Sequence, residues 1–255
     1  MKELRMQMKI STKLRTNTFA RSFRDLTLRA RESRQTLHHN LSGLISEFKI
    51  VSVVDVGANV GQFGIDLRRY GFKGEIYSFE PVVNIFNDLV STSLRKGPWT
   101  PINLALGSHP GDKVINVSGN SGLSSSFLEM KSLHQENFPS SIYVSSQLAE
   151  VSTVDIQVEL LKLEASKSIL KLDVQGFELE VLNGATQSLS DFAICLIEVS
   201  LSPLYQGEGS LLDILHILES NGHDVIDVFS GIRSNNGKLL QIDLVTLNRN
   251  QIFTK

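Results

Sequence analysis

One cysteine, few aromatic residues and no long apolar run set the first limits on this sequence of 255 residues. Cys195 has no second cysteine with which to form an intramolecular disulfide, and because it lies within the apolar run FAICLIEV we expect a buried thiol. No apolar run approaches the roughly 18 residues of a transmembrane helix, and the N-terminus lacks a continuous apolar segment like that of a secretory signal. These absences predict a cytoplasmic protein.

The histidines, the cysteine and the acidic residues do not occur at metal-ligand spacing, so we predict no metal site. Clusters of basic and aromatic residues are absent from the body of the chain, which predicts no nucleic-acid partner.

Positive charge is concentrated at the N-terminus. The first 40 residues contain ten Lys and Arg against three acidic residues, a charge of +7, so the rest of the chain carries −9 of the net charge of −2. Leu, Phe and Met recur there at loosely helical spacing. We predict that residues 1–47 form a basic, partly helical extension that packs on the domain or on another subunit of a homo-oligomer. The alternative is a basic arm in peripheral contact with an anionic membrane surface.

From residue 48 onward, apolar strand-like segments alternate with helical ones. Strands are expected at residues 50–56, 75–79, 101–106, 168–174, 192–199, 224–229 and 239–247, and helices at residues 61–70, 82–94, 177–183 and 209–221. Such alternation is typical of an α/β fold. We therefore predict one domain over residues 48–255, with a mainly parallel seven-stranded sheet and helices on both faces.

Residues 118–151 interrupt this alternation. The segment is rich in serine and has no clear hydrophobic period. Long loops in compact domains are often functional, so we expect a variable, substrate-facing loop here.

The stretch VVDVGANVGQFG (53–64) joins an apolar strand to a helix through a glycine-containing turn. Such a turn lets a ligand lie against backbone N–H groups with no Cβ in the way. A dinucleotide fingerprint would need glycines at 57, 59 and 62, but Asn59 and Gln62 occupy two of these positions. An acidic residue that closes the strand, followed by G-x-N-x-G, fits the S-adenosylmethionine loop of Rossmann-like methyltransferases.

Glu80 closes the next strand, 25 residues after Asp55. At this position an acidic side chain accepts hydrogen bonds from the two ribose hydroxyls of a nucleoside cofactor. NAD and S-adenosylmethionine both contain such a ribose, so Glu80 by itself does not distinguish them.

Five motifs together resemble the FkbM-type S-adenosylmethionine-dependent methyltransferases. They are DVGANVG (55–61), FEP (79–81), NLALG (103–107), LKLDVQGFELEVLNGA (170–185), and IEVS with PLY (197–205). The resemblance implies a Rossmann-like class I methyltransferase fold and O-methylation of a sugar, glycan or other hydroxyl-bearing small molecule. One departure is notable: the common D-x-E-G run of the family has glutamine, Gln175, in place of the glutamate.

The resemblance also implies positions for the cofactor-binding residues. Around the methionine and ribose portions of S-adenosylmethionine it places Asp55, Gly57, Ala58, Asn59, Gly61 and Gln62. It assigns Glu80, with Pro81, to the ribose, and Asn103 and Ala105 to the adenine. It sets Asp173, with Gln175 close behind, beside the transferring methyl group.

An aliphatic hydroxyl is a poor nucleophile, so its proton needs a base. Asp173 is the first candidate, and its alternative roles are to orient the methionine amino group or to cap the following helix. Glu178, Glu198 and His134 are further catalytic candidates. The alternative for Glu178 is an acid favoured by the helix dipole, and the alternative for His134 is an ordinary surface histidine.

Two other functions stay open at this point. One is an NAD-dependent oxidoreductase, which accounts for the strand, the turn and Glu80 but leaves residues 170–185 unexplained. The other is a catalytically silent scaffold that binds S-adenosylmethionine, an interpretation that Gln175 favours slightly.

Overall fold

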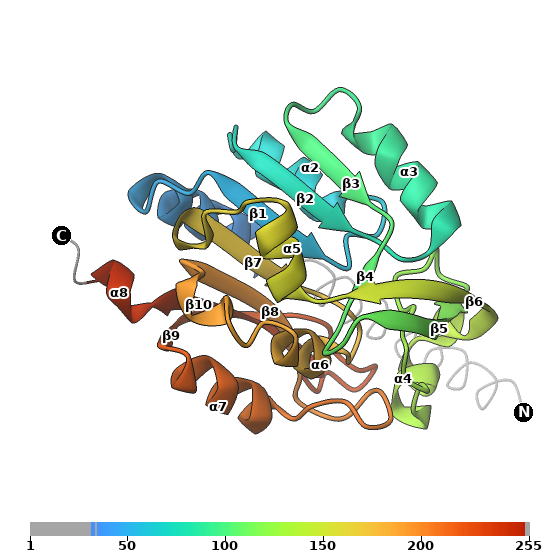
Figure 1. The fold of residues 1–255 in the computed structure, drawn as a ribbon. Helices are drawn as coiled ribbons and strands as arrows, with labels where there is room; N and C mark the ends of the chain where they lie inside the picture. The colour runs from blue at the N-terminus through green and yellow to red at the C-terminus, as the bar shows by residue number, and fades with distance from the viewer. Residues whose placement is uncertain (1–31, 34, 253–255) are drawn as a thin grey trace, which may run out of the picture.

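A computed structural model describes residues 32–33 and 35–252 (Figure 1). Seven strands form the main sheet in the order β3-β2-β1-β7-β8-β10-β9. Five neighbouring strands are parallel: β3 (Trp99–Ile102), β2 (Glu75–Phe79), β1 (Ser52–Val56), β7 (Ser168–Leu172) and β8 (Ile194–Ser200). Strand β10 (Gln241–Asn248) is antiparallel to both β8 and β9 (His223–Ser230). The mainly parallel seven-stranded sheet expected from the sequence is confirmed.

Helices cover both faces of this sheet. One apolar core contains side chains from α5 (Val154–Leu160), α6 (Glu178–Asn183) and α7 (Leu211–Ser220). The core on the opposite face contains side chains from α2 (Gln62–Arg69), from α3 (Val83–Ser93) and from a helix over residues 35–47. Shorter elements complete the chain: η1 (Pro139–Ser141), η2 (Ala165–Lys167), η3 (Leu189–Asp191) and α8 (Arg249–Ile252).

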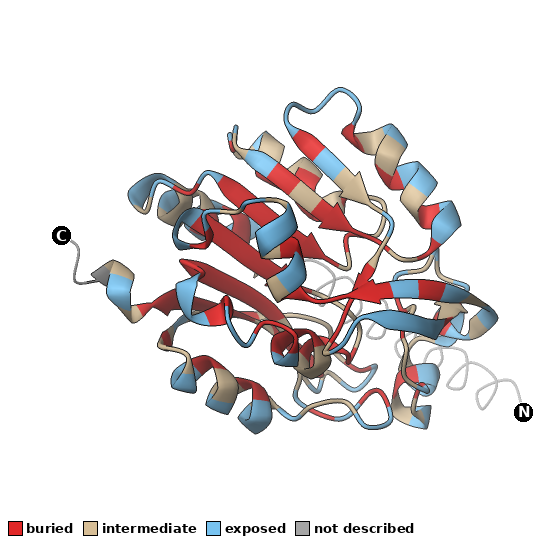
Figure 2. Cartoon of the chain, viewed as in Figure 1, coloured by how far each residue is buried: buried red, intermediate tan, exposed pale blue. Residues whose placement is uncertain are grey.

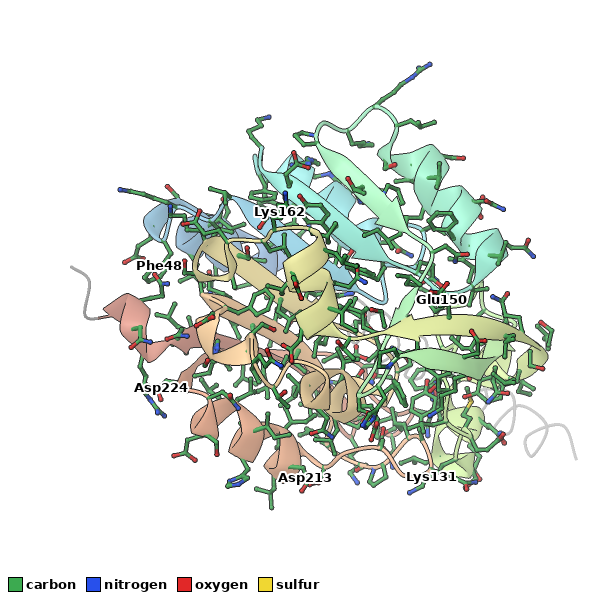
Figure 3. All side chains as sticks on the ribbon, viewed as in Figure 1. Phe48, Lys131, Glu150, Lys162, Asp213 and Asp224 are labelled. Carbon is green, nitrogen blue, oxygen red and sulfur yellow. The ribbon has the colours of Figure 1, made fainter. Side chains whose placement is uncertain are left out.

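The central strands are buried along their whole length, as Figure 2 shows in red. All five residues of β1 and all five of β7 are buried, because helices cover both faces and leave no side of these strands in water. Charged side chains such as Glu150, Lys162 and Asp213 are exposed (Figure 3). The buried charges of Asp55 and Lys171, inside the two central strands, are therefore exceptional.

A second, three-stranded sheet has the order β4-β6-β5, with β4 (Ala105–Leu106), β5 (Gly111–Ser118) and β6 (Tyr143–Ser152). Two expectations are corrected here. The strand expected at residues 101–106 is broken at residues 103–104, so its halves belong to different sheets. The loop expected over residues 118–151 contains helix α4 (Ser132–Asn137) and most of β6. Strand β6 was not predicted because its sequence lacks the alternation of polar and apolar residues that marks a half-buried strand. Its polar and apolar residues are exposed alike over most of its length.

The described part of the N-terminal extension is helical over residues 35–47. Leu37 and Leu41 are buried in the same core as Phe63 and Phe229. Residues 1–31, on which the membrane-contact prediction rests, lie outside the described residues. Within the described range, no helix combines the length and the apolar character that crossing a membrane requires.

Candidate functional site

A cavity of about 360 Å³ lies at the carboxyl ends of β1, β2, β7 and β8, the edge where open α/β sheets bind ligands. Most residues selected from the sequence line it, namely Gly57, Ala58, Asn59, Gln62, Glu80, Pro81, Ala105, Asp173, Gln175 and Glu198. The others lie outside its lining: Asp55, Gly61, Asn103, Glu178 and His134.

The turn after β1 has left-handed backbone conformations at Gly57 (φ 76°) and Asn59 (φ 49°). A Cβ at Gly57 would lie 1.9 Å from the carbonyl oxygen of Asp173, so only glycine lets the turn approach the end of β7 this closely. Asparagine tolerates the left-handed region well, which explains how this turn forms without a second glycine at position 59.

From the sequence we expected the turn to present its backbone N–H groups to a ligand, but its first N–H groups are bonded within the protein. The N–H groups of Gly57 and Ala58 both donate to the carbonyl oxygen of Phe79, at 3.1 and 3.0 Å, and the Asn59 N–H donates to Glu80 Oε2 at 2.9 Å. Because these donors are satisfied within the protein, the turn contributes the shape of the cavity and holds the end of β2.

Glu80 is a buried carboxyl group at the cavity wall. Its Oε2 accepts from the Asn59 N–H, and its Oε1 accepts from the Val82 N–H at 2.9 Å. Burial raises the pKa of Glu80 to about 7, against the lowering effect of these two hydrogen bonds. Each oxygen keeps a free lone pair, so the carboxylate can still accept hydrogen bonds from a ligand.

Two residues expected at the cofactor have other contacts. The Asn103 side chain donates to the carbonyl oxygens of Glu80 and Pro81, at 2.8 and 3.1 Å, so it fixes the backbone behind Glu80. Gly61 begins α2, and a Cβ there would lie 3.0 Å from the Trp99 ring. Both residues support the site from outside the cavity.

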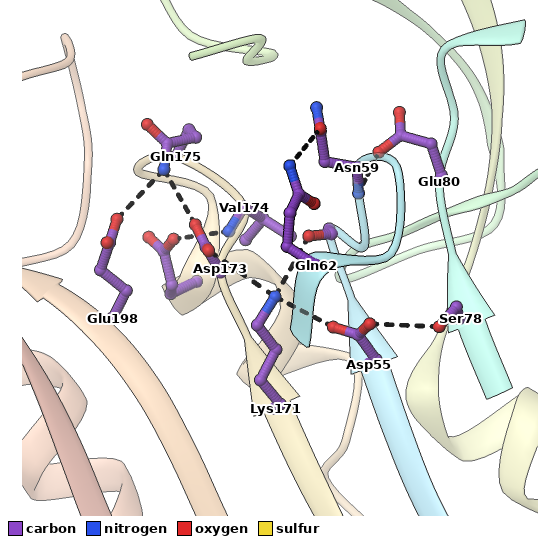
Figure 4. A network of polar contacts seen from close by, with 12 residues as sticks. Asp55, Asn59, Gln62, Ser78, Glu80, Lys171, Asp173, Val174, Gln175 and Glu198 are labelled. Carbon is purple, nitrogen blue, oxygen red and sulfur yellow. Dashed lines mark hydrogen bonds and ion pairs between the residues drawn. The ribbon is translucent and has the colours of Figure 1, made fainter. Parts of the chain in front are cut away.

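Lys171, which the sequence analysis missed, connects two of the candidate residues (Figure 4). Its Nζ lies 3.0 Å from Asp55 Oδ1 and 3.6 Å from Asp173 Oδ2, and it donates to the carbonyl oxygen of Gly57 at 3.1 Å. Burial alone would lower the pKa of Lys171, but the two carboxylates outweigh it and raise the pKa above its ordinary value. The available signal was a lysine among the apolar residues of the strand SILKL.

Gln175 connects the next pair of carboxylates. Its Nε2 donates to Asp173 Oδ1 at 2.9 Å and to Glu198 Oε1 at 3.1 Å (Figure 4), and its Oε1 accepts from the Tyr205 hydroxyl at 2.9 Å. Gln241 also donates to Glu198 Oε1, at 2.6 Å. Gln241 belongs to none of the motifs, and the PLY motif, which contains Tyr205, gave that side chain no role, so both were missed. The amide of Gln175 therefore separates two acidic groups that would otherwise repel each other.

Glu198 lies on β8 in register with Asp243 of β10. Burial raises the pKa of Glu198 well above its ordinary value, and the nearby charges of Asp173 and Asp243 raise it further. The edge of the sheet beside Asp173 is thus acidic.

The side chains of Glu178 and His134 are buried and contact other parts of the protein, not the cavity. Glu178 Oε1 accepts from the Val174 N–H at 2.9 Å, and burial raises the pKa of Glu178 to about 8. His134 is only 2% exposed, so it is neither a surface histidine nor a group that faces the cavity. Its ring packs edge-on against Phe138 and Tyr205, and burial lowers its pKa to about 4. Across residues 32–33 and 35–252, no group of three or more His, Cys, Asp or Glu side chains is arranged to hold a metal ion.

The fold and the cavity define the class of this protein. A mainly parallel sheet with one antiparallel strand, and a cavity with a buried acid at the end of β2, are the features of a Rossmann-like methyltransferase domain. The Methyltransferase FkbM domain matches residues 55–225, well over half of the chain. The chain belongs to the FkbM methyltransferase family.

The chain also has weaker similarity to individual known proteins and solved structures. The hexuronic acid methyltransferase AglP of Haloferax volcanii is 26% identical over 145 residues, which are 57% of this chain and 54% of the relative. The chain thus spans about half the length of this curated relative. Magnesium protoporphyrin IX methyltransferase from Synechocystis PCC 6803, solved with bound S-adenosylmethionine, is 13% identical (88% of this chain, 83% of that chain, TM-score 0.48). A TehB-like methyltransferase from Corynebacterium glutamicum is 13% identical (92% and 99%, TM-score 0.39).

S-adenosylmethionine is the cofactor of this domain, and the residues present fit it. The absence of a Cβ at Gly57 keeps the turn close to β7, and the Glu80 carboxylate retains acceptor capacity for hydroxyl groups. Phe127 and Phe177, with ring centroids 4.9 Å apart, form an aromatic wall of the cavity against which an adenine ring can pack.

Proposed function

We propose that the protein is an S-adenosylmethionine-dependent O-methyltransferase that acts on a hydroxyl group of a sugar, a glycan or a related small molecule. The observation that carries this proposal is Asp173, a carboxylate at the cavity wall whose side chain is 39% exposed while its neighbours Lys171 and Asp55 are buried. The sugar acceptor of AglP supports the choice of acceptor class.

In this proposal, the ribose of the cofactor is held by Glu80, the methionine portion lies beside Gly57, Asn59 and Gln62, and the adenine contacts Ala105 and Phe177. Asn59 and Gln62 are linked by a hydrogen bond from Gln62 Nε2 to Asn59 Oδ1 at 2.9 Å. This bond fixes the two amides as one polar edge of the cavity.

S-adenosylmethionine supplies an electrophilic methyl group on a sulfonium. The task of the protein is to align an acceptor hydroxyl with it and to remove the hydroxyl proton. Asp173 accepts that proton in our proposal. Lys171 Nζ lies 3.6 Å from Asp173 Oδ2, and Gln175 Nε2 donates to Oδ1, so the carboxylate has a fixed orientation.

Binding and transfer test the proposal together. Calorimetric titration should give micromolar binding of S-adenosylmethionine and none of NAD, and tighter NAD binding would favour an oxidoreductase. A screen of sugars, nucleotide sugars and lipid-linked oligosaccharides with radiolabelled cofactor should identify a methylated hydroxyl.

We expect Asp173→Asn to bind S-adenosylmethionine within about threefold of the parent and to lose at least about 100-fold in kcat, the range of general-base contributions. Asn can accept the hydrogen bond from Gln175 but cannot take a proton. A variant that retained turnover would exclude Asp173 as the base, and cofactor binding without transfer by the parent would indicate a silent scaffold.

A further inference from the structure

A row of buried polar side chains crosses the sheet from β3 to the wall of the cavity. Trp99 Nε1 donates to Ser78 Oγ at 3.0 Å. Ser78 Oγ donates to Asp55 Oδ2 at 3.1 Å, and Asp55 Oδ1 lies 3.0 Å from Lys171 Nζ (Figure 4). We call these four side chains the polar row. They come from the neighbouring strands β3, β2, β1 and β7.

The register of the sheet explains why these side chains meet. Asp55 is paired with Ser78 of β2 and with Lys171 of β7. Side chains alternate between the faces along a strand, so Asp55 shares a face with Val53, two residues before it. Val53 and Trp99 belong to the apolar core on the face that α2 covers. The polar row therefore lies inside an apolar core.

One end of the polar row contacts both parts of the site. Lys171 Nζ donates to the carbonyl oxygen of Gly57 in the turn at 3.1 Å, and it lies 3.6 Å from Asp173 Oδ2. Because a single ammonium group makes both contacts, a displacement of Asp55 would move the turn and the proposed base relative to each other.

The other end of the polar row is fixed by packing. A Cβ at Gly64 in α2 would lie 2.3 Å from the Trp99 ring, so this helix approaches the indole so closely because it has glycine there. The helix holds the indole in place, and the indole N–H thus has a fixed direction toward Ser78.

A buried ion pair such as that of Asp55 and Lys171 adds little net stability, because the desolvation of two charges offsets their attraction. It keeps a good geometry only where hydrogen bonds satisfy the remaining polar atoms. Ser78 supplies such a bond to Asp55 Oδ2, and among the described residues no second donor reaches this oxygen. The position of Lys171 Nζ therefore depends on a hydroxyl group outside the cavity lining.

We propose that Ser78 is a positioning residue for methyl transfer, acting through Asp55 and Lys171. By orienting this ion pair it fixes the carboxylate of Asp173 relative to the turn at Gly57. The inference rests on the proposed function, in which Asp173 accepts the proton of the acceptor hydroxyl.

The kinetics of Ser78→Ala test this role, with Ser52→Ala as the matched control. Ser52 is buried at the opposite, amino end of β1, where its hydroxyl is hydrogen-bonded to that of Ser168. We expect Ser78→Ala to lower kcat at least about tenfold while the acceptor KM stays within about threefold, because a misplaced base slows transfer and leaves acceptor binding intact. Ser52→Ala should leave both constants within about twofold, although each variant removes one buried hydrogen bond.

A second background shows whether Ser78 acts through Asp173. In Asp173→Asn, which has already lost the proposed base, adding Ser78→Ala should lower kcat by less than about twofold. An equal tenfold loss in both backgrounds would overturn the inference. Normal kcat in Ser78→Ala would overturn this inference alone, whereas a parent protein that transfers no methyl group would overturn the proposed function as well.

Urea denaturation gives a readout that needs no acceptor. Ser78→Ala and Lys171→Met remove two partners of the same Asp55 carboxylate, so their effects on the free energy of unfolding should not be additive. The effects of Ser52→Ala and Lys171→Met should be additive. Additivity in the first pair would show that Ser78 does not act on Lys171 and would overturn the inference.

Discussion

At Glu80, deep burial and two backbone hydrogen bonds act in opposite directions on one carboxyl group. Burial disfavours the charge and dominates, which is why the pKa of Glu80 is raised to about 7. A ligand that donates hydroxyl hydrogens to the carboxylate favours the ionised form. Ligand binding and ionisation at Glu80 are therefore coupled.

Glu80→Gln keeps the shape of the side chain and removes half of its acceptor capacity. We expect the affinity for S-adenosylmethionine to fall at least about 100-fold, because the buried amide leaves a ribose hydroxyl without its charged partner. Calorimetry measures the change, and circular dichroism verifies the fold. Glu75→Gln, at the exposed start of the same strand, is the matched control. Binding within threefold of the parent would remove Glu80 from the cofactor site.

The affinity for S-adenosylmethionine should rise with pH between about 6 and 8. Below its pKa of about 7, Glu80 is protonated in the free protein, so binding must release a proton and is weaker by up to about tenfold per pH unit. Calorimetry in buffers of different ionisation enthalpy measures this proton release. In Glu80→Gln the part of the pH dependence due to Glu80 should vanish, and an unaltered profile would show that another group titrates.

Lys171 should contribute to stability as well as to the site. Lys171→Met leaves the Asp55 carboxylate buried without its ion pair, and we expect a loss of about 3–5 kcal/mol in the free energy of unfolding. Urea denaturation measures it. Lys167→Met removes a 46% exposed lysine whose partner, Glu164, is 54% exposed, and should cost less than about 1 kcal/mol. Adding Asp55→Asn to Lys171→Met should recover part of the loss, and simple additivity would contradict a direct pair.

At the scale of elements, strands were predicted correctly from the sequence where a run of apolar residues ends near an acidic residue. The central strands are short, mostly apolar segments, and the acidic residues at or near their carboxyl ends have a position fixed by the fold class. It failed for β6, whose exposed Val144 and Leu148 break the alternation, and for the strand that divides at residues 103–104.

For the candidate site, the motifs indicated which residues come together but not how they are connected. The Asp55–Lys171 pair depends on the register between β1 and β7, and the Gln175–Tyr205 bond joins segments 30 residues apart. Neither the register nor that bond is encoded by a local pattern. The direction of the turn N–H groups was mispredicted for the same reason, because their acceptor is on β2.

The small sheet supplies an aromatic residue to the cavity from the segment between its strands β5 and β6. We expect Phe127→Ala to weaken S-adenosylmethionine binding by about 5- to 100-fold, the range for loss of stacking between an aromatic side chain and a base. Calorimetry measures the loss. Ile142→Ala, at an exposed apolar residue next to β6, is the control and should bind normally. Equal affinities for the two variants would mean that the base lies away from this sheet.

For the whole molecule, the raised pKa values predict how stability depends on pH. A carboxyl with a higher pKa in the folded than in the unfolded state binds its proton more tightly when folded, so its contribution is fully present below about pH 4.5. It declines as pH rises through the folded values of about 7 for Glu80 and about 8 for Glu178. We expect these two carboxyls to cost the cofactor-free protein several kcal/mol between pH 5 and 8, at about 1.4 kcal/mol per unit of pKa difference, and the lowered pKa of His134 to offset part of this loss below about pH 6.5.

Urea denaturation at several pH values measures this dependence. The variant Glu178→Gln should show a shallower decline than the parent, because one titrating group is gone. A free energy of unfolding that rises from pH 5 to 8 would contradict the raised pKa values.

Strand β10 follows β9 in the chain yet lies between β8 and β9 in the sheet. On the ribosome, the growing chain has β8 with an open edge until residues 241–248 emerge and insert there. Pairing between distant segments is slow, and an unpaired strand edge favours association with other chains. Asp243 and Gln241 arrive with this strand, so the acidic edge of the cavity is completed only after β10 has inserted between β8 and β9.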